Sequence, residues 1–307
     1  MKTKKIAFAA ALPLGAAVLT REMYRFIFCR NGSLLLNSFM SGKSHKPDYY
    51  EHRDGTAEAL RQRRQQLYTL RSVRGETLQG YYFPCGGEGK RIAFLIHGYR
   101  SEHAETAGMY LDYYESRGFD LFCCDHVSHG RSEGKYIGFD VFESEDCLLW
   151  LDFLRKEFGE EVQIVLHGFS MGAATVLCMS DRCPENVKFI VADSGYMDAR
   201  VPLKGQLGAL YYPLRLINWR VAGYDLARSD TRPHLRAAKL PILFVHGQED
   251  RTVPFENGPR LVNFYQGERD CLFVPHARHV ETMHVAPEAY AEKLDGFIRR
   301  YINDLSS

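Results

Sequence analysis

The 307-residue chain has almost no excess charge of either sign, because 39 lysines and arginines balance 38 aspartates and glutamates, for a net charge of +1. A nucleic-acid-binding domain usually carries a clear basic excess, so no nucleic-acid partner is expected. The eight cysteines include no C-x-x-C pair and no Cys/His group at zinc-site spacing. We therefore expect neither a bound metal nor a dense disulfide framework.

The chain also lacks an unbroken apolar run of the roughly 20 residues that a transmembrane helix needs. The longest run covers residues 6–19, follows three lysines and is interrupted by Pro13. We interpret residues 1–30 as a hydrophobic anchor or signal-like segment that associates the protein with a membrane. The alternative is an N-terminal helix that packs on the domain of a cytoplasmic protein.

Apolar residues make up 45% of the chain and charged residues 25%, which is the composition of a folded protein with one large core. Residues 31–67 are polar and predict a linker followed by a charged surface helix. Two alternating segments about Gly75 then predict an antiparallel hairpin over residues 68–83. We expect the folded domain to cover residues 68–307.

Short apolar runs alternate with helical segments after residue 91, which predicts buried parallel strands joined by helices. The expected strands are Ile92–Ile96, Asp120–Cys124, Val162–Leu166, Phe189–Ala192, Ile242–Val245 and Cys271–Val274. The pattern favours an α/β fold with a doubly wound, mostly parallel sheet. The segment of about 195–238 breaks the alternation and is expected to form a cap insertion with helices of its own.

A G-x-S-x-G motif, Gly168 to Gly172, lies directly between an apolar strand and a run of small residues that opens a helix. This context is typical of a tight turn that lifts the hydroxyl of Ser170 above the sheet at a helix N-terminus. A serine hydroxyl is a poor nucleophile unless a base accepts its proton and an acid orients that base. Ser170 is therefore the candidate nucleophile.

The acid and the base are expected at the carboxyl ends of the last two strands. Asp250 follows the strand that begins at Ile242 and is the candidate acid, although Asp193 at the end of an earlier strand is a rival. Three histidines follow the final strand, and spacing favours His279 over His276 and His284. The order Ser, Asp, His along the chain is typical of this arrangement.

Two backbone amides are expected to stabilise a developing oxyanion. Tyr99 follows a histidine and a glycine at the end of a strand, and Met171 directly follows the candidate nucleophile. Other polar residues near strand ends have a structural interpretation: Asp125 and His129 are expected to fix their loop. His97, His167 and His246 each precede a glycine at a strand end and are expected to be structural histidines with satisfied hydrogen bonds. The cap aromatics are expected either to line an acyl pocket or to pack the cap on the core: Tyr196, Tyr211, Tyr212, Trp219 and Tyr224.

Residues 68–303 resemble an α/β-hydrolase of the bacterial, N-terminally anchored type, related to a serine peptidase and esterase group that lacks a propeller domain. The motifs are I-H-G-Y at 96–99, D-H-V-S-H-G-R-S-E-G at 125–134, G-F-S-M-G at 168–172, A-G-Y-D-L at 222–226 and H-G-Q-E-D-R-T-V-P at 246–254. The resemblance implies Ser170, Asp250 and His279 as the catalytic triad, and Tyr99 and Met171 as oxyanion donors. Two positions depart from the pattern of this group. Val127 stands where the second motif usually has arginine. His276 and Arg278 stand where glycines often flank the alanine in the loop of the catalytic histidine.

The expected function is hydrolysis of carboxylic esters through an acyl-enzyme, without a cofactor. The alternative is a serine peptidase of aminopeptidase or acyl-peptide type, because the same residues cleave esters and amides. A third interpretation is a binding protein that keeps the fold without catalysis. The expected partner is a small ester or peptide substrate, and deletion of residues 1–30 is expected to leave a soluble, active enzyme.

Overall fold

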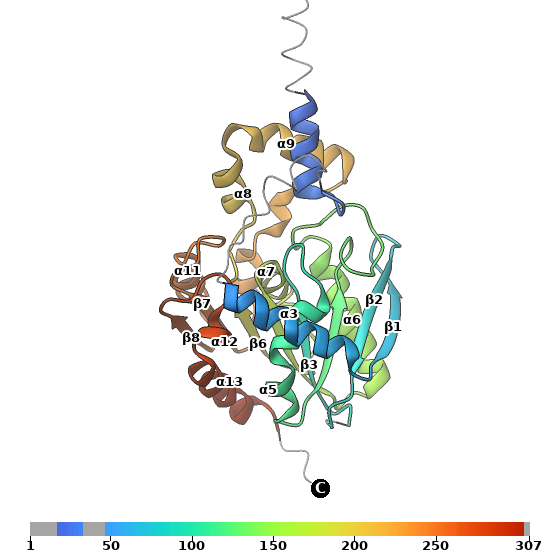
Figure 1. Cartoon of the computed structure of the whole chain (residues 1–307), viewed down its shortest axis with the longest axis vertical. Coiled ribbons are helices and arrows are strands. Elements are labelled where there is room, and N and C mark those ends of the chain that lie inside the picture. The colour runs from blue at the N-terminus through green and yellow to red at the C-terminus, as the bar shows by residue number, and fades with distance from the viewer. Residues whose placement is uncertain (1–16, 33–46, 87, 304–307) are drawn as a thin grey trace, which may run out of the picture.

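The computed structural model of the chain describes residues 17–32, 47–86 and 88–303 (Figure 1). At its centre lies an eight-stranded sheet with the strand order β1-β2-β4-β3-β5-β6-β7-β8. The strands β1 and β2 pair antiparallel, as do β2 and β4, and all other neighbours are parallel. The bounds are β1 Gln66–Arg71, β2 Thr77–Phe83, β3 Arg91–Ile96, β4 Asp120–Asp125, β5 Gln163–Phe169, β6 Val187–Asp193, β7 Ile242–Gly247 and β8 Arg269–Val274. The prediction of a mostly parallel sheet is confirmed.

Helices cover both faces of this sheet because successive side chains of each central strand point to opposite faces. In β3, Ile92 and Phe94 belong to one buried cluster, whereas Ala93 and Leu95 belong to the other. The first cluster includes side chains of α6 Glu143–Phe158, α7 Met171–Cys178 and α11 Asn257–Phe264. The second includes side chains of α3 Pro47–Gln62, α4 His103–Ala107, α5 Leu111–Glu115 and α13 Pro287–Tyr301. The doubly wound architecture is thus the predicted one.

The structure contains the charged surface helix that the sequence predicts before the hairpin. Helix α3 starts at Pro47, where the missing N–H of proline costs nothing in a first turn, and it ends at Gln62. It does not reach residue 67, because Gln66 pairs with Tyr82 across the β1–β2 hairpin. Its Tyr49 and Leu60 are buried, so α3 is part of the packed domain.

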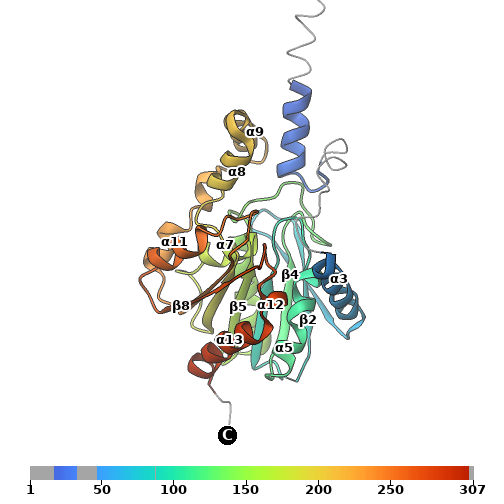
Figure 2. The same ribbon diagram turned by 60° about the vertical axis from the view of Figure 1, so that its left-hand side comes forward.

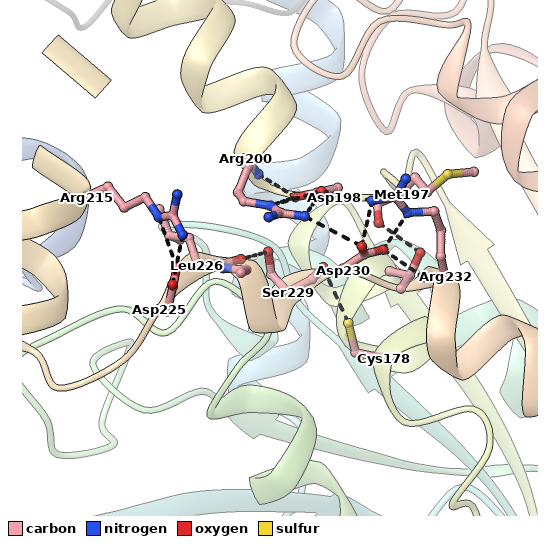
Figure 3. A network of polar contacts seen from close by, with 12 residues as sticks. Cys178, Met197, Asp198, Arg200, Arg215, Asp225, Leu226, Ser229, Asp230 and Arg232 are labelled. Atoms are coloured by element: carbon pink, nitrogen blue, oxygen red, sulfur yellow. Dashed lines mark hydrogen bonds and ion pairs between the residues drawn. The ribbon is translucent and has the colours of Figure 1, made fainter. Parts of the chain in front are cut away.

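The segment expected as a cap lies between β6 and β7 and contains α8 Arg200–Leu207, α9 Tyr211–Val221 and α10 Arg232–Ala237. It rises above the sheet on the side opposite the C-terminus (Figures 1 and 2). Ion pairs tie its two ends together: Arg200 contacts Asp198 at 2.6 Å and Asp230 at 3.5 Å, and Arg232 contacts the same two carboxylates (Figure 3). Because Asp198 is nearly buried, this cluster fixes where α8 leaves the sheet.

Residues 17–28 form a helix that stands beside the cap and reaches into the core at its lower end (Figure 1). Tyr24, Ile27 and Phe28 are buried in the same cluster as α6 and α7. The carbonyl of Phe28 accepts a hydrogen bond from the amide of Ile137, and Cys29 bridges to Tyr136. These are the contacts of a segment folded with the domain.

The expected membrane anchor falls mostly on residues 1–16, which lie outside the described residues. Within the part of the chain that the structure describes, no helix combines the length and hydropathy needed to cross a bilayer. The expected linker likewise falls largely on residues 33–46, which are not described.

Candidate active site

Ser170 occupies a sharp turn between β5 and α7, with φ at 55° and ψ at −115°. This positive φ is strained for a residue with a side chain, and it is typical of the turn that presents a nucleophile. Glycines make the turn possible: a Cβ on Gly168 would lie 2.2 Å from the carbonyl oxygen of Gly172, and one on Gly172 would lie 2.1 Å from that of Ile96. The amide of Ser170 also donates to the carbonyl of Asp193 at 2.9 Å, which fixes the turn against β6.

His279 brings its imidazole to this serine from the loop after β8. Its Nε2 lies 2.7 Å from Oγ of Ser170, and its Nδ1 lies 2.7 Å from Oδ2 of Asp250. Because a carboxylate only accepts hydrogen bonds, Nδ1 carries the proton and Nε2 is free to accept one from the serine. The side chain of His279 is only 10% exposed, so little water competes for these contacts.

Asp250 is held in place by the loop after β7. Its Oδ1 accepts hydrogen bonds from the amides of Thr252 and Val253, both at 2.9 Å. Burial acts to raise the pKa of Asp250, but the contacts with His246 and His279 outweigh it and hold the pKa at about 2. The group is therefore a carboxylate at neutral pH.

The rival residues named from the sequence lie in other contacts. Asp193 accepts hydrogen bonds from Thr282, Ser194 and Tyr290. The side chain of His276 is 82% exposed and pairs with Glu249. His284 faces Asp48 at 3.3 Å, away from the serine. The structure brings together Ser170, Asp250 and His279, and leaves the rivals out.

The two expected oxyanion donors, Tyr99 and Met171, line the same pocket as Ser170. Met171 is the first residue of α7, where helix amides point toward the turn. Gly98 packs so closely that a Cβ there would lie 3.1 Å from Cβ of Ser170, which places the neighbouring Tyr99 at the nucleophile. The hydroxyl of Tyr99 donates to the carbonyl of Ile27 at 2.9 Å, so its ring position depends on the N-terminal helix.

Two pockets flank the serine and differ in polarity. One, of about 160 Å³, is mainly apolar and is lined by Phe26, Ile27, Tyr99, Phe139, Ser170, Met171, Tyr196, Ala199, Pro202, Leu203, Gln206, Thr252 and Val253. The other, of about 170 Å³, borders His279 and contains charged and polar groups, among them Arg53, Arg100, Ser101 and Glu105. The site thus separates an apolar from a polar side.

The cap aromatics do not line the apolar pocket as a group. Of the five aromatics named, Tyr196 lines the apolar pocket, whereas Tyr211 and Tyr224 are buried and Tyr212 and Trp219 are exposed. The sequence reasoning missed Phe26 and Ile27, which come from the segment interpreted as an anchor. The only signal for them was the second apolar cluster at residues 24–28.

Two groups of side chains have the composition of a metal site. Ligand atoms of Cys124, His126 and Cys147 lie within 4.8 Å of one another, and so do those of Glu102, His103 and Asp125. Residue spacing did not indicate the first group, because β4 and α6 bring its members together. Neither group lines a pocket beside Ser170, and the carboxylate of Asp125 already accepts hydrogen bonds from Tyr81 and Arg131.

The chain is similar in sequence to several known proteins. The family described as serine aminopeptidase, S33, matches residues 87–224. The uncharacterized protein YqkD of Bacillus subtilis is 22% identical over 78% of this chain and 81% of its own length. Mouse monoglyceride lipase is 30% identical over 54% of each chain.

Among solved structures, the esterase Pf2001 of Pyrococcus furiosus superposes with a TM-score of 0.63, at 20% identity, over 79% of this chain and 92% of its own. At this identity the likeness shows the fold. Taken with the family match and the order of strands and helices, it shows that the chain has the α/β-hydrolase fold.

Proposed function

We propose that the protein is a serine hydrolase that cleaves carboxylic esters through an acyl-enzyme. The observation that carries the proposal is the chain of contacts from Ser170 through His279 to Asp250, with two distances of 2.7 Å. The nucleophile, the base and the acid come from three separate loops at the carboxyl ends of parallel strands. Burial of these three polar side chains has an unfavourable desolvation free energy, and a catalytic role accounts for their arrangement.

The reaction begins when Oγ of Ser170 attacks the ester carbonyl carbon and Nε2 of His279 takes the hydroxyl proton. Asp250 stabilises the imidazolium, and the amides of Tyr99 and Met171 hold the oxyanion. The C–O bond to the alcohol then breaks, and His279 returns its proton to the leaving oxygen. Water repeats these steps on the acyl-enzyme and releases the carboxylic acid.

The two pockets favour an ester with an apolar acyl group of modest size and a more polar alcohol. An acyl chain fits the apolar pocket, where it replaces water at Phe26, Ile27 and Leu203. The alcohol side faces His279 and the polar pocket with Arg53 and Glu105. This division matches the direction of proton delivery from His279 to the leaving group.

The alternative is an aminopeptidase, which the description of the matching family favours. Such an enzyme holds the ammonium group of its substrate with a carboxylate on the acyl side. The apolar pocket contains no carboxylate among its lining residues, and Glu105 lies in the other pocket beside Arg53, at 3.6 Å. We therefore place the ester first.

A fluorophosphonate probe and a substrate panel test the proposal. Wild type and Ser101→Ala should be labelled and should hydrolyse p-nitrophenyl esters, whereas Ser170→Ala should do neither. Ser101 is the matched control because its hydroxyl lies in the polar pocket and donates to Glu105. Faster cleavage of aminoacyl anilides than of any ester would replace the esterase by the peptidase. Absence of labelling and of turnover in the folded wild type would leave a binding protein.

A further inference from the structure

Exposed apolar side chains gather on two segments of the chain, the N-terminal helix and the cap. Among the described residues, eight of the eleven exposed large hydrophobic side chains lie on the helix of residues 17–28 or on the cap segment 201–221. Leu216 and Trp219 are 51% and 55% exposed, and with Tyr212 they follow helical spacing along one side of α9. Val18 and Leu19 are exposed on the neighbouring helix. A patch confined to two adjacent elements marks an interaction surface.

The two elements contact each other through their side chains. The hydroxyl of Tyr24 donates to Oδ1 of Asn218 at 3.4 Å. A groove of about 830 Å³ lies between them, bordered by Ile217 and Val221 of α9. It is larger than either pocket beside Ser170.

The groove is basic as well as apolar. Arg21, Arg25, Arg30 and Lys135 border it, and its lining includes no aspartate or glutamate. Arg30 is fixed by hydrogen bonds to backbone carbonyls of the loop at Gly130 and Ser132, so part of the positive charge is built into the domain. An occupant that complements this face must be anionic and must also offer an apolar phase.

We propose that this face docks on the surface of a lipid bilayer that contains anionic lipids. The apolar side chains of α9 and of residues 17–28 would enter the acyl region, and the basic groove would hold the headgroups. The sequence that precedes the face has the same character, because the apolar run that begins at residue 6 follows Lys2, Lys4 and Lys5. A second copy of the chain fits less well, because a twofold contact would set the two basic grooves against each other.

The docking face also leads to the active site. Phe26 and Ile27 from the lower end of the helix and Pro202 and Leu203 from α8 all line the apolar pocket beside Ser170. A bilayer held at the face would therefore present an ester at the mouth of the acyl pocket. Docking itself does not depend on hydrolysis, and only this delivery step rests on the proposed esterase activity.

Co-sedimentation of the full chain with vesicles tests the docking. Vesicles of phosphatidylcholine and phosphatidylglycerol in equal amounts should bind the wild type, and the double variant Leu216→Glu/Trp219→Glu should bind about tenfold or more weakly. The matched control is Leu67→Glu/Val73→Glu, whose parent side chains are 51% and 49% exposed but lie on the β1–β2 hairpin. The control should bind as wild type does. Equal loss in both variants, or no loss in the α9 variant, would overturn the proposal.

A second experiment tests the basic side chains of the groove. Arg21→Gln/Arg25→Gln should weaken binding about tenfold, and pure phosphatidylcholine should bind the wild type far less than the mixture does. Ser170→Ala should bind normally, which separates docking from hydrolysis. Light scattering tests the alternative occupant. If the wild type forms a dimer and does not bind vesicles, and if Leu216→Glu/Trp219→Glu abolishes that dimer, this face is a contact between two copies.

Discussion

The backbone amide of Arg100 donates a hydrogen bond to Nε2 of His129 at 3.1 Å. Nδ1 of the same ring lies 3.0 Å from the carbonyl of Val127, so Nδ1 carries the proton and Nε2 accepts. Burial lowers the pKa of His129 to about 3, which keeps the ring neutral across ordinary pH. Arg100 has a φ of 56°, and it follows Tyr99, the expected oxyanion donor. A neutral histidine therefore fixes the strained loop that carries this amide.

His129→Ala should lower kcat for a short p-nitrophenyl ester by about tenfold and leave KM nearly unchanged, because only the transition state uses the Tyr99 amide. His129→Gln should recover part of kcat, since its amide oxygen can accept from Arg100. Steady-state kinetics of both variants check this. A rise in KM with unchanged kcat would instead assign His129 to substrate binding.

The three histidines after β8 should differ sharply. His279→Ala removes the group that contacts both Ser170 and Asp250, and kcat should fall roughly 10³-fold or more. His276→Ala and His284→Ala should retain most activity, because their contacts are with Glu249 and Asp48. All three variants should melt within a few degrees of wild type. If either flanking variant were the inactive one, the assignment of the base would be wrong.

Stability should fall as the pH rises through neutrality, because of buried Glu143. Burial raises its pKa to about 7, and its Oε2 has no hydrogen-bond partner among the described residues. A folded-state pKa above the unfolded value means that the proton stabilises the fold fully below about pH 4, and that this contribution is lost as the pH passes about 7.

Glu143→Gln should therefore flatten the pH dependence of the unfolding free energy between pH 5 and 8, by at most about 1.4 kcal/mol per pH unit. Part of the slope should persist, because burial also raises the pKa of Asp146 to about 7. Urea unfolding at several pH values measures the slope, with Glu161→Gln as the exposed control. Identical slopes in wild type and Glu143→Gln would contradict the expectation.

Two N-terminal deletions should separate the undescribed segment from the folded one. Removal of residues 1–16 should leave ester hydrolysis and the melting temperature unchanged. Removal of residues 1–30 takes away Phe28, which is 1% exposed, and the pocket wall at Phe26 and Ile27. It should cost about 3 kcal/mol or more of unfolding free energy and impair the turnover of longer acyl esters. The structure thus revises the sequence-based expectation that the longer deletion is harmless, and a fully stable and active 31–307 protein would restore it.

The sequence by itself determined the features that depend on neighbours along the chain. Alternation of short apolar runs with helical periods predicted the parallel sheet, because burial on two faces selects such runs. The turn at Ser170 was readable because its two glycines stand within two residues of the serine, and Asp250 because it lies three residues after a strand.

Only the tertiary structure decided what depends on segments far apart in sequence. Which histidine faces Ser170 is set by how the loop after β8 crosses the sheet edge, over a separation of 109 residues. That Asp193 is engaged by Thr282 and Tyr290 follows from the packing of α12 Thr282–Val285 and α13 on the sheet. The wall formed by Phe26 and Ile27 arises because Tyr99 and Phe139 offer an apolar surface to residues 17–28. Periodicity can show that a side chain is buried, but the partner against which it packs is chosen by the folded chain as a whole.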